Sequence, residues 1–405
     1  MQPILTGLRI IEASAFIAAP MCGMTLAQLG ADVIRFDPIA GGIDYRRWPV
    51  TAANHSIYWA DLNKGKRSFA VDLKHPEGRD LIARLITAPG PDAGIFSTNL
   101  PASGWLAYDT LKARRADVIQ LAIVGDRHGS TALDYTVNAQ VGYPLLTGPA
   151  DDARPVNHVL PAWDITAAML AATSLLAALR FRDRTGLGQK IELALADVAL
   201  ATVGHLGLIG ERVINQGERE RGGNHLYGAF GRDFTTRDQV RVMVVAISPK
   251  MWNGLLTATG LNEAMGAVAA RLGLDFAEEG ARYRGRLAIA EVLEGWFAAQ
   301  NFAEVARAFN AAGVCWGKYQ TLSELIDSDP DCSSANPIFH AVAQPNIGTY
   351  PVPGVPAHFG AVVREPARCA PRLGEHTDSI LADILGLSSS EIGSLHDRGI
   401  VGGPR

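Results

Sequence analysis

One aspartate in the first half of the chain has the chemistry of a nucleophile. Asp134 lies in the run Leu133–Gly142, directly after a loop rich in Gly, Ser and Thr. A carboxylate can attack an activated acyl group and divide one difficult exchange into two easier covalent steps. An Asp in such a position is more simply an N-cap that accepts backbone N–H bonds, and Asp164, before an Ala-rich stretch, is even more cap-like. The residues alone therefore leave Asp134 open between a cap and a nucleophile.

The densest cationic cluster lies in Asn63–Ser68, directly before a predicted strand. Two lysines and Arg67 surround Gly65 there, and Arg35 and Arg46-Arg47 can join from neighbouring loops. Lysine supplies point charges and arginine a planar fork, a combination that suits a phosphate-rich ligand. A solvated basic turn explains the same cluster, so an anion pocket is one of two interpretations.

Composition and motifs argue against several other functions. The net charge of −4 disfavours nucleic acid, which needs a strongly basic surface. Phe16–Pro20 stands where a dinucleotide-binding GxGxxG would follow the first strand. The histidines and cysteines show no metal-ligand spacing, so we expect no metal site. The chain begins with no signal-like segment, and the apolar stretch Ile165–Leu179 is shorter than the roughly 20 residues of a membrane span. We therefore expect a cytoplasmic protein that binds no membrane.

The order of apolar segments predicts an α/β fold that opens with a parallel sheet. Gly7–Ala13 and Ala31–Asp37 are predicted strands on either side of a helix over Met21–Leu29, which makes a βαβ unit. Further strands are predicted over 68–72, 92–97, 117–123, 190–195 and 240–246, and helices over 165–181, 197–214, 288–299, 302–312, 377–385 and 389–395. The polar, Gly-containing run Asn215–Gly223 predicts a domain boundary, and the Pro-rich chain after Asp329 allows only short edge strands.

Four motifs, in order along almost the whole chain, resemble the class III coenzyme A transferase family. The matching segments are Gly7–Glu12 with Leu26–Arg35, Leu62–Ser68 with Val71–Gly78, Thr185–Gln189 with Leu195–Asp197, and Pro371–Thr377. The resemblance implies a large Rossmann-like domain with a parallel sheet, built from both chain ends, with a small α/β domain between them. The implied segments are 1–215 and 331–405 for the large domain and 216–330 for the small one. It also implies an interlocked homodimer.

The same resemblance assigns roles to residues. Coenzyme A is expected as part of a thioester substrate, with no permanently bound cofactor, and the family's catalytic Asp is placed at Asp134. The residues that the resemblance places around coenzyme A are Arg35, Lys66 and Arg67 at the nucleotide and phosphates, Ala19 and Pro20 in the loop near the thioester, and Gly222-Gly223 in a mobile glycine loop.

Leu133 separates two branches of that family. Racemases of the family carry His-Asp where this chain has Leu133-Asp134, and Leu133 cannot remove an α-proton. Asp164 falls on the racemases' second acid, which would have no partner here. Acyl-carboxylate exchange is therefore expected in place of proton abstraction.

Further segments, among them Ser14–Pro20, Tyr45–Val50 and Asn157–Asp164, resemble a branch that moves coenzyme A between the two carboxyl groups of one C5 unsaturated dicarboxylate. An Arg or His must then hold the distal carboxylate, and Arg47, His158 and His225 are candidates from composition. The alternatives are an intermolecular CoA-transferase that uses a free acid such as succinate, and a non-catalytic CoA-binding subunit.

Overall fold

The computed structural model describes residues 2–404 and divides the chain into two compact units. The first unit combines Met1–Val141, Val159–Ile209 and Asp329–Arg405, and the second combines Gly142–His158 and Gly210–Ser328. Residues from both ends of the chain therefore build the first unit.

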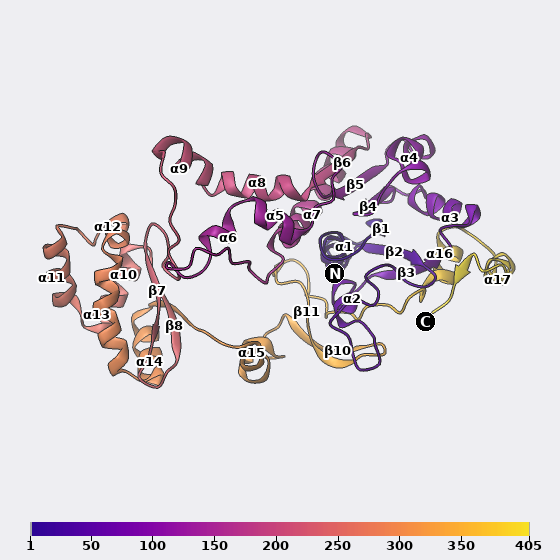
Figure 1. The fold of residues 1–405 in the computed structure, drawn as a ribbon. Coiled ribbons are helices and arrows are strands. Elements are labelled where there is room, and N and C mark those ends of the chain that lie inside the picture. The colour runs from indigo at the N-terminus through magenta and orange to yellow at the C-terminus, as the bar shows by residue number, and fades with distance from the viewer. Residues whose placement is uncertain (1, 405) are drawn as a thin grey trace. The chain divides into compact units, whose positions relative to one another are not determined.

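A mostly parallel sheet forms the centre of the first unit (Figure 1). Its strands are β1 (Arg9–Ala13), β2 (Asp32–Pro38), β3 (Arg67–Val71), β4 (Ile95–Thr98), β5 (Ile119–Val124), β6 (Lys190–Ala194) and β12 (Val401–Gly402), in the order β12-β3-β2-β1-β4-β5-β6. All neighbouring pairs are parallel except β12, which is antiparallel to β3. The expected parallel α/β sheet is confirmed. The strand order reverses at β1, with β2 on one side and β4 on the other.

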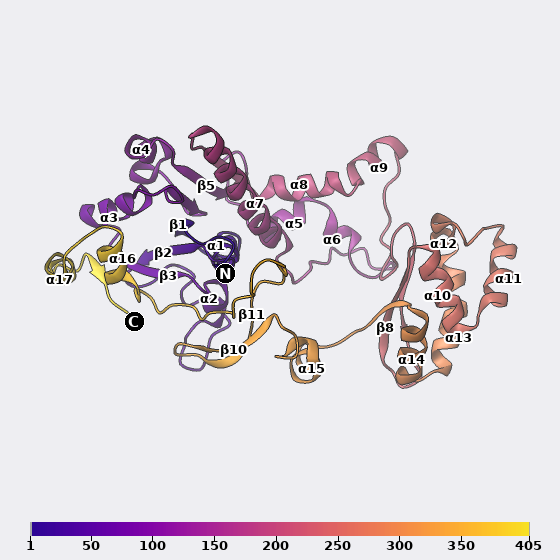
Figure 2. The same cartoon turned by 180° about the vertical axis from the view of Figure 1, so that it is seen from behind.

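Helices cover both faces of this sheet (Figure 2). Those of the first unit are α1 (Ala18–Gln28), α2 (Ile57–Leu62), α3 (Pro76–Ile86), α4 (Tyr108–Arg114), α5 (Asp134–Gln140), α7 (Ala162–Thr185), α8 (Leu195–His205), α16 (Thr377–Asp383) and α17 (Ser389–Asp397), with a 3₁₀ turn at Gly104–Leu106. Helix α7 packs against α1 and β5, whereas α3, α16 and α17 share a buried core with the other face of the strands. Helix α9 (Leu208–Asn215) follows α8 after Gly207. The sequence predicted a single helix over 197–214, but the left-handed φ of +79° at Gly207 ends the first helix and separates it from α9.

Helix α7 is longer than predicted. It runs for 24 residues and ends at Gly186, which has a left-handed φ of +72°. By length and composition it is able to cross a membrane, so the prediction that this stretch is too short for a span is wrong. Small side chains such as Ala167, Ala168 and Ala171 are nevertheless fully buried in the first unit, where they allow close packing against α1.

The second unit is an antiparallel sheet with helices packed on it. Its strands β7 (Phe230–Thr235), β8 (Arg241–Ala246) and β9 (Cys315–Lys318) lie in that order. Its helices are α6 (Tyr143–Leu146), α10 (Pro249–Thr259), α11 (Asn262–Leu272), α12 (Glu279–Arg284), α13 (Arg286–Ala299), α14 (Phe302–Ala312) and α15 (Leu322–Ser328). Aromatic side chains build the core, and Phe234 stacks on Phe297 at 4.7 Å between ring centroids.

The segment Gly142–His158, predicted within the large domain, clusters instead with the second unit. The reason is the Arg221 guanidinium, which donates to the backbone carbonyls of Pro144, Leu145 and Arg154. After a 3₁₀ turn at Pro330–Cys332, the chain returns to the first unit through the antiparallel pair β10 (Phe339–Gln344) and β11 (Gly348–Pro353), the short strands expected for its Pro-rich sequence.

Candidate active site

A cavity of about 460 Å³ opens in the first unit where the strand order reverses. Its walls come from the segments that follow β1, β4 and β5 and from one edge of β6. The lining residues include Phe16, Ala18, Asn99, Leu100, Pro101, Gly125, Ser130, Thr131, Leu133, Asp164, Lys190 and Glu192. Ligands of open α/β sheets bind at such a switch point, outside the carboxyl ends of the strands. This cavity is therefore the candidate active site.

Asp164 is the aspartate that lines the cavity. It lies in the first turn of α7 and is half-buried. Burial and then the neighbouring Asp134 charge raise the pKa of Asp164 to about 6, against the opposing effect of Arg47. At neutral pH the side chain is consequently a carboxylate, and a more basic one than an ordinary Asp.

Asp134 has a different place. Its side chain is 2% exposed and lies outside the lining of the cavity. Its Oδ2 accepts hydrogen bonds from the backbone N–H groups of Trp163 (2.7 Å) and Asp164 (3.1 Å). Its Oδ1 is buried without a hydrogen-bond partner among the described residues. Asp134 is thus a cap, but on the start of α7 and not on its own helix α5.

The loop after β1 is held in an unusual backbone conformation beside the cavity. Phe16 has a φ of +66°, a left-handed value that is rare for a bulky residue, and its N–H donates to Asp44 Oδ2 at 3.1 Å. The Asn99 amide accepts from the Ala15 N–H and donates to the Ala15 carbonyl, which ties this loop to the end of β4. Strain of this kind is maintained only where the surroundings enforce it, and it often marks a functional site.

Arg47 lies against the same loop. Its guanidinium carbon is 5.3 Å from the ring centroids of both Phe16 and Tyr58. The side chain is exposed, and its charge lowers the pKa of Asp164. The charges of Arg47 and Asp134 therefore both act on Asp164. Arg47 is exposed to solvent, whereas Asp134 is buried.

The cations predicted to hold phosphates are occupied inside the protein. The Lys66 ammonium donates to Glu12 Oε1 (2.6 Å), the Pro20 carbonyl (2.8 Å) and Asn63 Oδ1 (2.9 Å), which uses all three of its N–H groups. The buried Arg35 guanidinium donates to Asp37, Asp44 and Asn63. Burial lowers the pKa of Lys66, but its partners are those of a charged ammonium. This structure does not support phosphate contacts by Arg35 or Lys66.

Three further predicted residues lie away from the cavity lining. Arg67 pairs with Asp32 at 3.4 Å and donates to Ser379 at 3.3 Å. Ala19 and Pro20, predicted in a loop near the thioester, are instead buried in the first turn of α1. A proline is tolerated there because the first turn needs no N–H donor from it. Phe16 and Ala18 are the residues of this segment that line the cavity.

The remaining predicted residues belong to the second unit. His158 is half-buried, and Gly222 accepts a hydrogen bond from the His225 N–H at 3.1 Å in a turn where Gly223 has a φ of +59°. Sequence reasoning gave Phe16, Asn99 and Tyr58 no role. Asn99 could have been found, because a polar residue after a parallel strand lies at the ligand-binding edge of the sheet.

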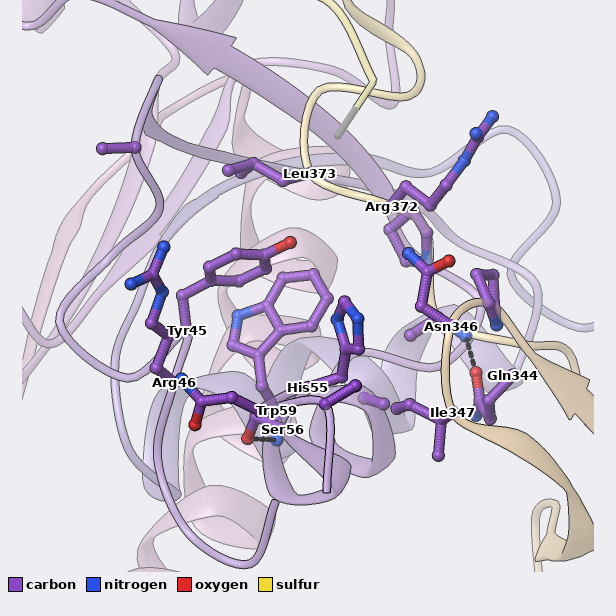
Figure 3. A pocket seen from close by; sticks show the side chains of 17 residues that line it. Tyr45, Arg46, His55, Ser56, Trp59, Gln344, Asn346, Ile347, Arg372 and Leu373 are labelled. Atoms are coloured by element: carbon purple, nitrogen blue, oxygen red, sulfur yellow. Dashed lines mark hydrogen bonds between the residues drawn. The ribbon is translucent and has the colours of Figure 1, made fainter. Parts of the chain in front are cut away.

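A second cavity, of about 370 Å³, lies elsewhere in the first unit between α2, the β10–β11 turn and the segment before α16 (Figure 3). Trp59 and Tyr45, whose rings meet edge to face at 5.1 Å, form its base with His55, and Arg46 and Arg372 flank it. Its lining includes neither Asp134 nor Asp164.

Comparison with known proteins agrees with this fold. The family model for CoA-transferase family III matches residues 5–377, and the chain belongs to this family. A 2-methylfumaryl-CoA isomerase from Chloroflexus aurantiacus is 58% identical over 405 residues, covering 100% of this chain and 99% of that protein. A succinyl-CoA–D-citramalate CoA-transferase from the same organism is 26% identical and covers 98% of each chain. The crystal structure of a CAIB/BAIF family protein from Brucella suis has a TM-score of 0.75 at 25% identity, over 95% of this chain and 100% of that one.

Proposed function

We propose that this chain is an intramolecular CoA-transferase that interconverts 2-methylfumaryl-CoA and 3-methylfumaryl-CoA. The observation that carries the proposal is the 58% identity, over the full length, to a 2-methylfumaryl-CoA isomerase. The cavity at the switch point of the sheet, with a carboxylate in its wall, supports it. Coenzyme A enters as part of the thioester substrate, and the proposed reaction needs no bound cofactor or metal.

Asp164 is the proposed nucleophile, in place of Asp134. Asp164 lines the cavity, whereas the one oxygen of Asp134 that has partners is occupied by two backbone N–H groups. A nucleophile must reach its electrophile, and a raised pKa makes a carboxylate the stronger base and nucleophile. Burial and geometry thus favour Asp164.

The proposed steps balance without an external proton or acid. A carboxylate oxygen of Asp164 attacks the thioester carbonyl, the C–S bond breaks, and a mixed anhydride and the CoA thiolate form. The thiolate attacks the aspartyl carbonyl, which gives an aspartyl-CoA thioester and frees the dicarboxylate. The other carboxylate of the same molecule attacks this thioester, and the thiolate then attacks the new anhydride at the substrate carbonyl and releases Asp164. Retention of the dicarboxylate makes the second attack effectively intramolecular.

Arg47 is the proposed partner of the distal carboxylate, because its exposed guanidinium lies beside the cavity residue Phe16. A guanidinium binds a carboxylate through two parallel N–H donors. His158, a candidate from composition, and the Gly222-Gly223 turn, a candidate from family resemblance, belong to the second unit, and the proposed reaction in this cavity uses neither. Leu133 lines the cavity and has no titratable group, which favours exchange over racemisation.

The direct test replaces Asp164. Asp164→Asn keeps the size of the side chain but is a poor nucleophile, so we expect the isomerisation rate to fall by at least about a thousandfold, the scale of covalent catalysis. Wild-type protein incubated with the thioester and hydroxylamine should carry a hydroxamate on Asp164, detected by peptide mass spectrometry. Asp183→Asn, on the last turn of the same helix, serves as the control. Full activity of Asp164→Asn, or a hydroxamate on Asp134 instead, would refute this assignment.

An intermolecular CoA-transferase is the second candidate, since one relative is a succinyl-CoA–D-citramalate CoA-transferase. Isotope-labelled free 2-methylfumarate added to the unlabelled thioester separates the two reactions. Retention of the original dicarboxylate gives unlabelled product, whereas incorporation of label would establish exchange with a free acid.

The proposal includes a homodimer in the cytoplasm. Helix α7 exposes Met169, Leu170 and Phe181 to between 40% and 45%, and α9 exposes Val213 and Ile214 to 69% and 79%. Large exposed apolar side chains on each of these helices are consistent with contact to a second chain. The four cysteines are free thiols, which suits a reducing compartment.

A further inference from the structure

We propose that Asp134 is a positioning residue whose buried negative charge occupies the N-terminal end of α7 and keeps the neighbouring Asp164 carboxylate reactive. The inference rests on the proposed function of Asp164. It gives Asp134 an effect on the reaction without contact with the substrate.

The geometry shows how the two aspartates are linked. Asp134 Oδ2 binds the N–H groups of Trp163 and of Asp164 itself, so it is bonded to the backbone of the proposed nucleophile. The Trp163 indole N–H donates to Asn138 Oδ1 at 3.2 Å, one turn further along α5. The start of α7 is therefore held to α5 at three points.

The negative charge of Asp134 opposes the effect that the N-terminus of α7 has on Asp164. The first N–H groups of a helix carry a positive partial charge, and a carboxylate in the first turn is normally stabilised by it. Stabilisation of this kind would make Asp164 a weaker nucleophile. Asp134 takes two of these N–H groups and places its own negative charge beside Asp164, so both effects act against such stabilisation. Its second oxygen is buried and has no hydrogen-bond partner among residues 2–404, an arrangement that is costly for a charged group.

The remaining titratable groups around Asp164 are few, and several of the charged ones form ion pairs with each other. Arg47 acts in the opposite direction from the loop after β2, and Tyr58 lies beside it on α2. Besides Asp134, the titratable groups on the elements that pack against α7 are Tyr135 on α5, Cys22 on α1, Asp197 (paired with Arg127) and His205 on α8, and the Lys190–Glu192 pair on β6. Asp134 is thus the carboxylate whose charge acts on Asp164 to raise its pKa, and it is bonded to the Asp164 backbone.

The test is Asp134→Asn, because an asparagine oxygen can still accept both N–H bonds while the charge is lost. Infrared difference spectra against pH, with Asp164→Asn subtracted as a blank, give the titration of the Asp164 carboxyl directly. We expect its midpoint to move to lower pH by roughly one unit, in the direction expected when a like charge is removed. The acid limb of kcat/KM should move by the same amount, with a several-fold lower rate at pH 8. Asp183→Asn, with the same change at the far end of α7, should leave both midpoints in place.

An unchanged Asp164 midpoint in Asp134→Asn would overturn the inference, as would an equal loss of activity at every pH. The two proposals fail separately. If Asp164→Asn remains active, the proposed nucleophile is wrong, while the infrared titration still reports whether Asp134 controls the Asp164 carboxyl.

Discussion

At the scale of single residues, the proposed site combines a nucleophilic carboxylate, Asp164, with two charged groups that shift its pKa, Asp134 and Arg47. Asp164 must be ionised to attack a thioester, and its pKa of about 6 lies above the ordinary value of an Asp. Activity should therefore be full above this pKa and fall as the pH decreases through about 6. The pH dependence of kcat/KM reports this titration in the free enzyme.

Arg47→Gln tests the second charge. Arg47 lowers the pKa of Asp164, so its loss should raise that pKa and move the acid limb of kcat/KM to higher pH, opposite to the effect of Asp134→Asn. The loss of a charged hydrogen bond to the distal carboxylate should also raise KM for the thioester about tenfold or more. Steady-state kinetics between pH 5 and pH 8 measure both effects. Arg46→Gln, the exposed neighbour that lines the second cavity, is the control. An unchanged KM would remove Arg47 from the substrate site.

Sequence patterns singled out both aspartates, and the family resemblance placed the nucleophile at Asp134, whereas the cavity favours Asp164. Asp134 is the first residue of α5 and Asp164 lies in the first turn of α7, and from the sequence both are typical of N-caps. The choice depends on which carboxylate points into a cavity and which is covered. That direction is set by the packing of α5 on α7, a contact between segments almost 30 residues apart, and no local pattern reports it.

At the scale of secondary-structure elements, a buried ion pair joins the strands beside the cavity to α1. Lys66, directly before β3, donates to Glu12 on β1 and to the carbonyl of Pro20 on α1, and both charged side chains are fully buried. The network fixes the start of α1 relative to the sheet. The loop that carries Phe16 lies between these elements, so its conformation depends on the network.

Lys66→Met tests this support. The variant leaves the Glu12 charge buried without its cationic partner, with the Ser14 hydroxyl as its remaining donor, and we expect the free energy of unfolding to fall by about 3–5 kcal/mol. Equilibrium urea denaturation measures the change. The double variant Glu12→Gln/Lys66→Met should recover part of the loss, because it removes both charges. Arg114→Met, which breaks an exposed pair with Asp80 in the same unit, should cost less than about 1 kcal/mol. Equal losses of unfolding free energy in Lys66→Met and Arg114→Met would show that the buried pair stabilises the fold no more than an exposed pair does.

Most elements of the large sheet were predictable, since short apolar runs alternate with amphipathic or Ala-rich stretches. The strands β1, β2, β3 and β5 and the helix α7 lie within a few residues of their predicted positions. By contrast, the structure does not support the predicted phosphate contacts of Lys66 and Arg35. A cluster of cations has the same sequence pattern whether it faces solvent or is buried against Glu12, Asp37 and Asp44.

At the scale of the whole molecule, the exposed apolar helices bear on assembly. In the part of the chain that the structure describes, α9 has no buried side chain, although it carries Ile209, Val213 and Ile214. A short helix with so little support from its own chain gains stability from a partner surface. The proposed homodimer would provide that surface.

The prediction is that the wild-type protein has twice the mass of one chain in size-exclusion chromatography with light scattering. Val213→Asp/Ile214→Asp should shift the population towards the mass of one chain, because two charges would be buried in the interface. A wild-type protein with the mass of one chain would exclude the dimer. A double variant that stays dimeric would exclude α9 from the interface.

The sequence by itself determined the α/β class, the parallel sheet, the family and the type of chemistry, because these depend on the order of apolar segments and motifs along the chain. Only the tertiary structure decided which aspartate faces the cavity, which cations are buried and which of them remain open to a substrate. The physical reason is that burial and hydrogen bonding depend on contacts between distant segments. Asp134 capping α7 and Lys66 paired with Glu12 are such contacts, and both changed the role expected for a residue.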